Sequence, residues 1–205
     1  MKKMRMILSD GKLEVKAANK GSFVLMKGDL LTSKADIIAC PVASTLFART
    51  VLATEIFEKN KPLVGRVNEV RKGKHVADFP LGTARLISAH DTGLNAKGVS
   101  LVVVDEGVST LGKLDYIQIV KKAVENTLTE SDARDMKSVA FPILNSFRGV
   151  FTGTIIDAMF TESMKYLNES SAKVKNIMLV VLPETYYEAE KAVFNAASDL
   201  VWKKE

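Results

Sequence analysis

The chain has 205 residues, of which 47% are hydrophobic and 26% are charged, and its formal net charge is +5. This length and apolar fraction predict one globular domain with a sizeable core and exclude a fibrous or disordered chain. The longest apolar run, residues 177–182, is far shorter than the ~20 residues of a membrane-spanning helix. Charged residues follow the basic N-terminus at once, so we expect a soluble protein that no signal peptide exports, without a membrane partner.

Metal and disulfide chemistry have few candidate residues in this sequence. Cys40 is the one cysteine, which excludes an internal disulfide and a multi-cysteine zinc site. His75 and His90 are the two histidines, which excludes a histidine-rich metal site. We therefore expect no metal, no cofactor and a reducing, cytoplasmic compartment.

The first half of the chain alternates short apolar runs with turn signals. Asp10 and Gly11 form a favoured two-residue turn, which predicts a hairpin extension within residues 1–21. Apolar residues at helical spacing predict a helix over residues 46–59. Strands are predicted at 22–27, at 37–40 where Pro41 ends the run, at 83–88 and at 100–104.

The second half alternates strands and helices more clearly. Strands are predicted at 138–142 and 177–182, and helices at 115–128, 154–167 and 186–201. This alternation predicts βαβ crossovers and one α/β domain over residues 1–205, with three α/β/α layers around a mixed, mainly parallel sheet. Ligands of such sheets bind beyond the carboxyl ends of the strands, which here are followed by loops 28–34, 41–45 and 145–153.

One segment carries most of the positive charge. Residues 59–74 contain one acidic residue, Glu69, and six basic ones: Lys59, Lys61, Arg66, Arg71, Lys72 and Lys74. Such a segment either attracts phosphate groups or forms a solvated surface that keeps the protein soluble. It contains no aromatic residue, so contacts with a nucleic acid would be mostly with phosphates.

Four short stretches occur in the order and spacing found in macro domains. Residues 27–32 and 35–38 resemble the family's opening, in which a Gly-Asp-aliphatic turn precedes an Asp-aliphatic strand. Residues 80–84 resemble the segment where Pro-x-Gly enters a strand, and residues 139–143 resemble the strand before the second ligand loop. The resemblance extends from about residue 23 to residue 194 and implies a macro-domain fold.

The family binds ADP-ribose, and some members hydrolyse ADP-ribosyl esters or related derivatives. The resemblance places Asp29 where the family's carboxylate accepts a hydrogen bond from the adenine amino group, a role that suits a carboxylate. The alternative is that Asp29 only caps the turn after a strand.

The next two elements of the family pattern differ here. The family's Asn-Ala-Ala-Asn is replaced by residues 41–44, so Ser44 stands where the last Asn contacts the distal ribose. The glycine-rich phosphate loop is replaced by residues 45–50, in which we expect Leu46 and Phe47 to obstruct a phosphate. Arg49 is either a phosphate contact or a surface arginine without a ligand.

The family's second ligand loop is recognisable only with inserted residues. Its candidate residues precede a helix that we expect to start at Thr154, whose N-terminus favours anions. Phe151 either stacks on the ligand or packs the loop against the core. Gly149 and Gly153 also fit a structural role without a ligand, as a turn and as the start of a helix. The candidate ligand residues of this loop are Asn145, Ser146, Arg148, Gly149, Phe151 and Gly153.

Catalysis has less support than binding. We expect His75 and His90 to be surface residues, because the adjacent His90 and Asp91 would face opposite ways in an extended chain. Cys40 ends an apolar strand and is expected to be a buried thiol, although it lies near the expected ligand cleft. The sequence predicts a divergent macro-domain module that binds ADP-ribose or a related adenine nucleotide. The alternatives are RNA or poly-ADP-ribose binding through residues 59–74, a protein-interaction scaffold, and an ADP-ribosyl hydrolase.

Overall fold

The computed structural model describes residues 5–75, 78–105, 112–144 and 150–202. The strands are β1 (Arg5–Ser9), β2 (Lys12–Lys16), β3 (Ser22–Lys27), β4 (Ile37–Ala43), β5 (Ala84–Ser88), β6 (Gly98–Asp105), β7 (Ser138–Phe141) and β8 (Asn176–Val181). The helices are α1 (Val51–Lys59), α2 (Lys61–Arg71), α3 (Lys113–Ala133), α4 (Thr152–Leu167) and α5 (Tyr186–Trp202), with the short 3-10 helices η1 (Leu30–Thr32) and η3 (Pro183–Thr185).

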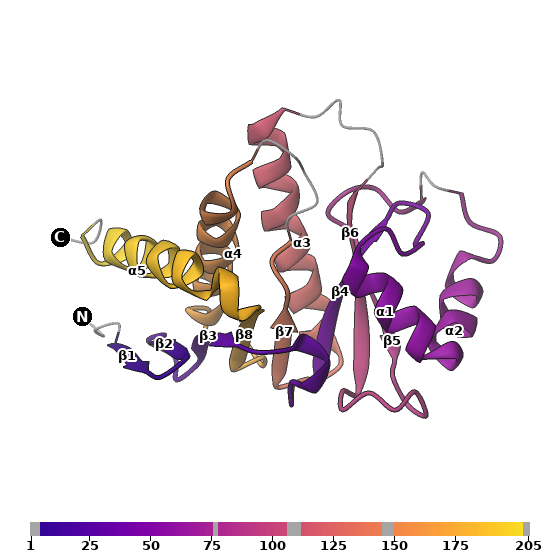
Figure 1. Ribbon diagram of the computed structural model, residues 1–205, viewed down its shortest axis with the longest axis horizontal. Helices are drawn as coiled ribbons and strands as arrows, with labels where there is room; N and C mark the ends of the chain where they lie inside the picture. The colour runs from indigo at the N-terminus through magenta and orange to yellow at the C-terminus, as the bar shows by residue number, and fades with distance from the viewer. Residues whose placement is uncertain (1–4, 76–77, 106–111, 145–149, 203–205) are drawn as a thin grey trace.

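All of these strands join one sheet in the order β1-β2-β3-β8-β7-β4-β6-β5 (Figure 1). The inner strands from β3 to β6 run parallel to one another. At one end β1 and β2 form an antiparallel hairpin on β3, and at the other end β5 pairs antiparallel with β6. The prediction of a mixed, mainly parallel sheet is therefore confirmed.

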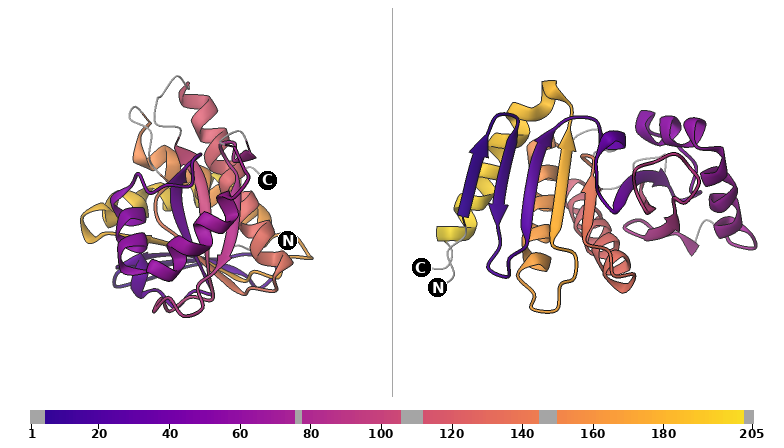
Figure 2. Two further views of the ribbon diagram at one scale, coloured as in Figure 1. Left: turned by 90° about the vertical axis from the view of Figure 1, so that its right-hand side faces the viewer. Right: turned by 90° about the horizontal axis from the view of Figure 1, so that it is seen from below.

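Helices lie on both faces of the sheet. Helices α3, α4 and α5 lie along one face, and α1 and α2 lie at the end of the sheet formed by β4, β6 and β5 (Figure 2). The side chains of β6 show the two faces, because Val102 and Val104 join the core beneath α3 to α5, whereas Leu101 and Val103 join the core with α1 and α2. The predicted three-layer α/β/α fold is confirmed.

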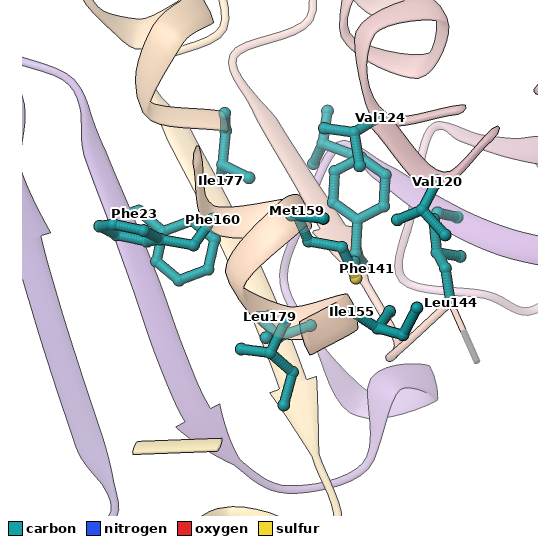
Figure 3. Close-up of a cluster of buried hydrophobic side chains, with 14 of the residues drawn as sticks. Phe23, Val120, Val124, Phe141, Leu144, Ile155, Met159, Phe160, Ile177 and Leu179 are labelled. Carbon is teal, nitrogen blue, oxygen red and sulfur yellow. The ribbon is translucent and has the colours of Figure 1, made fainter. Parts of the chain in front are cut away.

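The larger core fills the space between the sheet and helices α3, α4 and α5 (Figure 3). Phe23 of β3 meets Phe160 of α4 edge to face, with ring centroids 5.0 Å apart. Phe141 of β7 is fully surrounded by apolar neighbours, among them Val124 of α3 and Met159 of α4. This core fixes the strands whose carboxyl ends carry the candidate site.

Strand β4 continues through Pro41, where the sequence predicted its end. Proline lacks the N–H that a central strand uses in its ladder. The ladder between β4 and β7 consists of Ile37 with Val139 and Ile38 with Ala140, whereas Pro41 pairs in register with Val102 of β6. The missing N–H of Pro41 thus lies beyond the end of the β7 ladder, and the strand continues to Ala43.

Four helices differ from the sequence prediction by more than one residue, and one of them, α3, extends over Lys113–Ala133 instead of residues 115–128. Helix α1 begins at Val51 instead of residue 46, because Thr50 is extended and its hydroxyl oxygen accepts a hydrogen bond from Ala53 N at 3.1 Å. Helix α4 begins at Thr152, two residues before the predicted start. Helix α2 was not predicted at all, and it carries most of the basic segment, residues 59–74.

No helix among the described residues is both long enough and apolar enough to cross a membrane.

Candidate functional site

The candidate site lies along the edge of the sheet where the parallel strands end. Asp29 follows β3 and Ser44 follows β4, with β8 and β7 between these two strands. At about 4.8 Å for each strand-to-strand step, the two strand ends are ~14 Å apart. A ligand that contacts both residues must therefore be elongated along this edge.

Asp29 is an exposed residue that caps η1. One carboxylate oxygen, Oδ1, accepts a hydrogen bond from Leu31 N at 2.9 Å, as the turn interpretation expects. The other oxygen, Oδ2, has no hydrogen bond within the described part of the chain and stays accessible to a donor. A hydrogen bond to Glu55 raises the pKa of Lys59, and the negative charge of Asp29 adds to this shift, so Lys59 lies within electrostatic reach of Asp29.

The loop between β4 and α1 turns sharply at Leu46. Leu46 has φ +59°, a left-handed conformation that is strained for a bulky residue. Its N–H donates to Ala43 O at 2.7 Å, and its side chain is fully buried in the core shared with α1 and α2. Leu46 therefore does not extend across the loop surface, contrary to the sequence expectation. Phe47 is 53% exposed, and Arg49 is also exposed.

Ser44 lines a small pocket of about 90 Å³ beyond the end of β4, which we call the Ser44 pocket. The side chain is only 5% exposed, and its hydroxyl oxygen has no hydrogen-bond partner in the described structure. A buried polar group without a partner costs roughly 1–3 kcal/mol, so such a group needs an explanation. The other described residues of the pocket are Thr45, Arg71, Lys74, His75 and Phe79.

The C-terminal end of α2 brings positive charge to this pocket. The helix ends at Arg71, and Gly73 then adopts φ +69°, which closes a turn in which Lys74 N donates to Arg71 O at 3.0 Å. The Arg71 guanidinium carbon lies 3.8 Å from the centre of the Phe47 ring. Neither Arg71 nor Lys74 forms an ion pair with a carboxylate among the described residues.

The other basic residues of segment 59–74 point to different places. Arg66 Nη1 donates to Ser88 O at 2.7 Å, at the end of β5. Lys72 Nζ lies 4.0 Å from Glu69 Oε2, and Lys61 is exposed at the start of α2. The basic segment therefore forms an exposed surface in which Arg66 and Lys72 already have partners within the protein. Of its basic residues, Arg71 and Lys74 line the Ser44 pocket.

The predicted residues of the second loop lie elsewhere or outside the described residues. Asn145, Ser146, Arg148 and Gly149 belong to the undescribed part. Phe151, which is 76% exposed, and Gly153 line a pocket of about 400 Å³ between α4 and α5. This pocket is lined by one cation, Lys191, and by three carboxylates, so its net negative charge disfavours a phosphate: Asp157, Glu188 and Asp199.

The titratable candidates have clear positions. Burial raises the pKa of the Cys40 thiol to about 12, so a Cys40 thiolate is not available at neutral pH. His90 Nδ1 lies 2.6 Å from Asp91 Oδ2, contrary to the expectation that the two face apart, because Asp91 turns the chain at φ +60°. His75 lines the Ser44 pocket. The described residues contain no group of three or more metal-ligating side chains.

Sequence reasoning selected Ser44 as a ligand residue and Arg71 and Lys74 as members of the basic segment, and the structure places the three around one pocket. His75, which was predicted to be a surface residue, is exposed and also lines this pocket. Thr45 and Phe79 were missed as pocket residues. Phe79 lies five residues after Lys74, but only the fold shows that the chain returns there to the end of β4.

Comparison with solved structures defines the fold class. The Oceanobacillus iheyensis macrodomain with ADP has a TM-score of 0.78 at 14% identity, covering 97% of this chain and 99% of that chain. The macro domain of ganglioside induced differentiation associated protein 2 has a TM-score of 0.72 at 17% identity, covering 86% and 85%. A Trypanosoma brucei macrodomain in complex with ADP has a TM-score of 0.66 at 18% identity, covering 83% and 68%.

The chain therefore has the macrodomain fold, with a sequence that has diverged widely from these structures. No protein-family model and no curated protein sequence matches it. At such low identity the likeness establishes the fold alone, and the ligand must be argued from this chain's own residues.

Proposed function

We propose that this chain binds ADP-ribose or a related adenine nucleotide along the carboxyl-end edge of the sheet, with Asp29 accepting a hydrogen bond from the adenine amino group. The observation that carries the proposal is the Asp29 carboxylate, which is anchored through Oδ1 and keeps Oδ2 accessible. Support comes also from solved macrodomains, since one of similar fold was crystallised with ADP-ribose and another with ADP.

The geometry of Asp29 suits recognition of an exocyclic amine. A carboxylate is an acceptor only, so its accessible oxygen favours a donor such as the amino group of adenine. The hydrogen bond from Leu31 N fixes the orientation of the carboxylate before the ligand arrives, which reduces the ordering cost of binding. The ligand then extends from Asp29 past β8 and β7 toward Ser44.

We propose binding rather than hydrolysis. General-base catalysis needs a group that can take a proton from a positioned water. The thiol of Cys40 is fully buried, and Asp78 Oδ2, near the Ser44 pocket in the sequence, accepts a hydrogen bond from His75 N at 2.7 Å. The candidate base among the described residues of the Ser44 pocket is the imidazole of His75, which is exposed and has no hydrogen bond or carboxylate among the described residues to orient its ring toward a water.

Calorimetric titration of the full chain with ADP-ribose tests the proposal, with the variant Asp29→Asn as the decisive comparison. Asparagine keeps an oxygen for Leu31 N but places an NH₂ donor against the adenine amine. Loss of a hydrogen bond to a charged acceptor is worth about 1.5–3 kcal/mol, so we expect the Kd to rise roughly 10- to 150-fold.

Asp10→Asn is the matched control, because Asp10 is also an exposed aspartate and Asn-Gly forms the same hairpin turn as Asp-Gly. It should leave the affinity unchanged. Equal affinity of Asp29→Asn and the unmodified chain for ADP-ribose would overturn the role of Asp29. Failure of both ADP-ribose and AMP to bind would overturn the nucleotide proposal, and release of ADP-ribose from an ADP-ribosylated substrate would overturn the proposed lack of turnover.

A further inference from the structure

We infer that strand β1 is the contact surface for a second copy of this chain, which pairs its own β1 antiparallel to it across a two-fold axis. The sheet order ends at β1, so no strand among the described residues covers its outer edge (Figure 2). A two-fold dimer uses the same patch of both copies, so this patch must be complementary to itself. The pairing joins the two sheets into one and does not rest on the nucleotide site proposed above.

The outer edge of β1 is apolar and exposed, which is uncommon for a strand at the end of a sheet. All of its residues are exposed, and its centre consists of Met6, Ile7 and Leu8. Natural edge strands usually carry charges or a cover that prevents pairing with another chain. The opposite edge of this sheet has both, because Arg85 of β5 forms an ion pair with Glu130 at 3.2 Å and a guanidinium of α2 donates to the last carbonyl of β5. The centre of β1 lacks such protection.

The hydrogen bonds of the neighbouring strands show which backbone groups of β1 are free. Lys27 N donates to Gly11 O at 3.0 Å, in the register that pairs β2 with β3. Backbone bonds alternate along an antiparallel pair, so odd-numbered residues of β2 bond to β3 and even-numbered ones bond to β1. Those even-numbered residues pair with the odd-numbered residues of β1. The N–H and C=O groups of Met6 and Leu8 therefore point out of the sheet, toward the position of a further strand.

A pairing centred on Ile7 uses all of these free groups. It places Met6 of each copy opposite Leu8 of the other, and each such pair exchanges both of its N–H···O=C hydrogen bonds. Arg5 lies opposite Ser9, so no like charges face each other across the two strands. A shift by two residues in either direction leaves one of these free positions without a partner in the β1 of the other copy.

The side chains of the edge strand line an apolar groove between β1 and α5. Its volume is about 420 Å³, with Met6 and Leu8 on the strand side and Tyr187 and Phe194 on the helix side. Residues paired across two strands lie on the same face of a sheet, so Met6 and Leu8 of the second copy extend the apolar surface at the mouth of this groove. The exposed parts of the two grooves then cover each other.

The stripe of α5 that borders the groove is also complementary to itself. Its residues are spaced three or four apart along the helix or are adjacent, and they share one face: Tyr187, Glu190, Lys191 and Phe194. Where two copies of this stripe meet in opposite directions, Tyr187 lies opposite Phe194 and Glu190 lies opposite Lys191. Lys191 is exposed and forms no ion pair in the described part of its own chain, so its charge is available to the second copy.

The apolar area of this surface is that of a reversible dimer. Its large apolar residues are between 39% and 77% exposed: Met6, Ile7, Leu8, Tyr187 and Phe194. With roughly 200 Å² for a fully exposed large side chain, they offer up to about 500 Å² in each copy. The apolar area of both copies is thus about 1,000 Å², and the backbone of β1 and the charged residues raise the total toward the ~1,200–2,000 Å² of specific interfaces.

The test is sedimentation equilibrium of the full chain over a wide range of protein concentration, which measures the mass of the particle and the Kd of the dimer. We expect a reversible equilibrium between monomer and dimer. Leu8→Lys should weaken the dimer roughly tenfold or more, because it places a charge at the centre of the interface in each copy, at a side chain that is largely exposed in the monomer. Leu114→Lys is the matched control, because Leu114 is a similarly exposed leucine on α3, and it should change the Kd less than about twofold.

An exchange of charges on α5 tests the two-fold arrangement itself. Lys191→Glu places a carboxylate opposite Glu190 of the second copy and should weaken the dimer. Adding Glu190→Lys restores opposite charges between the copies, so the double variant should recover most of the affinity. The series starts from Lys191 because Glu190 also accepts a hydrogen bond from Tyr186 Oη at 3.3 Å within its own chain.

Three outcomes would overturn the inference. The first is a particle of monomer mass at every concentration, and the second is equal weakening by Leu8→Lys and Leu114→Lys while circular dichroism shows both variants folded. The third is growth to larger particles as the concentration rises, because a two-fold pairing of β1 uses up the free edge of both copies. A double variant that stays as weak as Lys191→Glu would overturn the pairing of the two α5 stripes.

Discussion

We expect the substitution Asp36→Asn to lower the free energy of unfolding by about 1.5–3 kcal/mol at neutral pH. Asp36 directly precedes β4, and its Oδ2 accepts hydrogen bonds from Lys137 N at 2.7 Å and Ser138 N at 3.2 Å. Its Oδ1 lies 2.8 Å from the ammonium of Lys97. One carboxylate thus connects the start of β4 with the start of β7 and with the turn before β6.

The magnitude follows from these contacts. Hydrogen bonds to a charged group contribute about 1.5–3 kcal/mol each, and asparagine retains one acceptor oxygen while placing an NH₂ donor against a donor. The Lys97 side chain is 67% exposed, so its ion pair with Asp36 contributes less than about 1 kcal/mol. Loss of about one charged hydrogen bond therefore dominates.

The same contacts make the effect depend on pH. Burial raises the pKa of Asp36, but the hydrogen bonds from Lys97, Lys137 and Ser138 outweigh it and hold this pKa below its usual value. A group whose pKa is lowered by folding contributes stability above its unfolded pKa of about 3.9, and this contribution disappears as the pH falls through the folded value. The difference between the unmodified chain and Asp36→Asn should therefore shrink in acid.

Urea unfolding followed by circular dichroism at pH 7 and near pH 2.5 measures this difference, with Asp10→Asn as an exposed control. A difference of the same size at both pH values would refute the role of the charge. No difference at pH 7 would refute the contribution of the hydrogen bonds.

Two further predictions concern the residues around the Ser44 pocket. Cys40 should react with a thiol reagent at neutral pH only at the rate at which the protein opens, because its thiol is fully buried and its pKa is about 12; stoichiometric labelling of the folded chain would contradict this. Leu46→Ala should lower the free energy of unfolding by about 2–5 kcal/mol through loss of a buried side chain. Leu46→Gly should be more stable than Leu46→Ala by about 1 kcal/mol in urea unfolding, because φ at this position is +59° and glycine tolerates that conformation; the opposite order would contradict the left-handed turn.

The sheet and the long helices could be predicted because their patterns are local. Helix α4 has a continuous apolar face that includes Ile156, Phe160 and Leu167, and this face packs on the sheet as the spacing indicates. Helix α2 was not predicted, because Gly65 and several charged residues weaken the helical pattern of its sequence. It is held by the burial of Leu63 and Val67, and the neighbouring Asn60 Nδ2 donates to Ile56 O at 2.6 Å. The burial of Leu63 and Val67 is a tertiary effect that overrides weak helix propensity, whereas the Asn60 bond is a local cap at the end of α1.

The candidate site, like the fold, could be predicted only where the pattern is local in the sequence. Asp29 could be selected because its strand, turn and cap lie within a few residues. Two facts of the fold, by contrast, decide the neighbours of Ser44. Strand β4 passes through Pro41, and α2 runs back so that its last turn reaches the end of β4. Neither fact has a local signal in the sequence.

The loop after β4 differs from the glycine-rich loop of the family pattern in what its backbone amides bond. Where the family has a glycine-rich loop, this chain has a turn in which Leu46 N donates to Ala43 O, so this amide is not free to hold a phosphate. The Leu46 side chain is instead buried, and Phe47 is left at the surface beneath Arg71. Arg71 and Lys74 lie beside this loop at a partly exposed site, where salt screens their charges. In the binding that we propose, contact with the ligand beyond β4 would therefore rest on charged side chains and would weaken as the salt concentration rises.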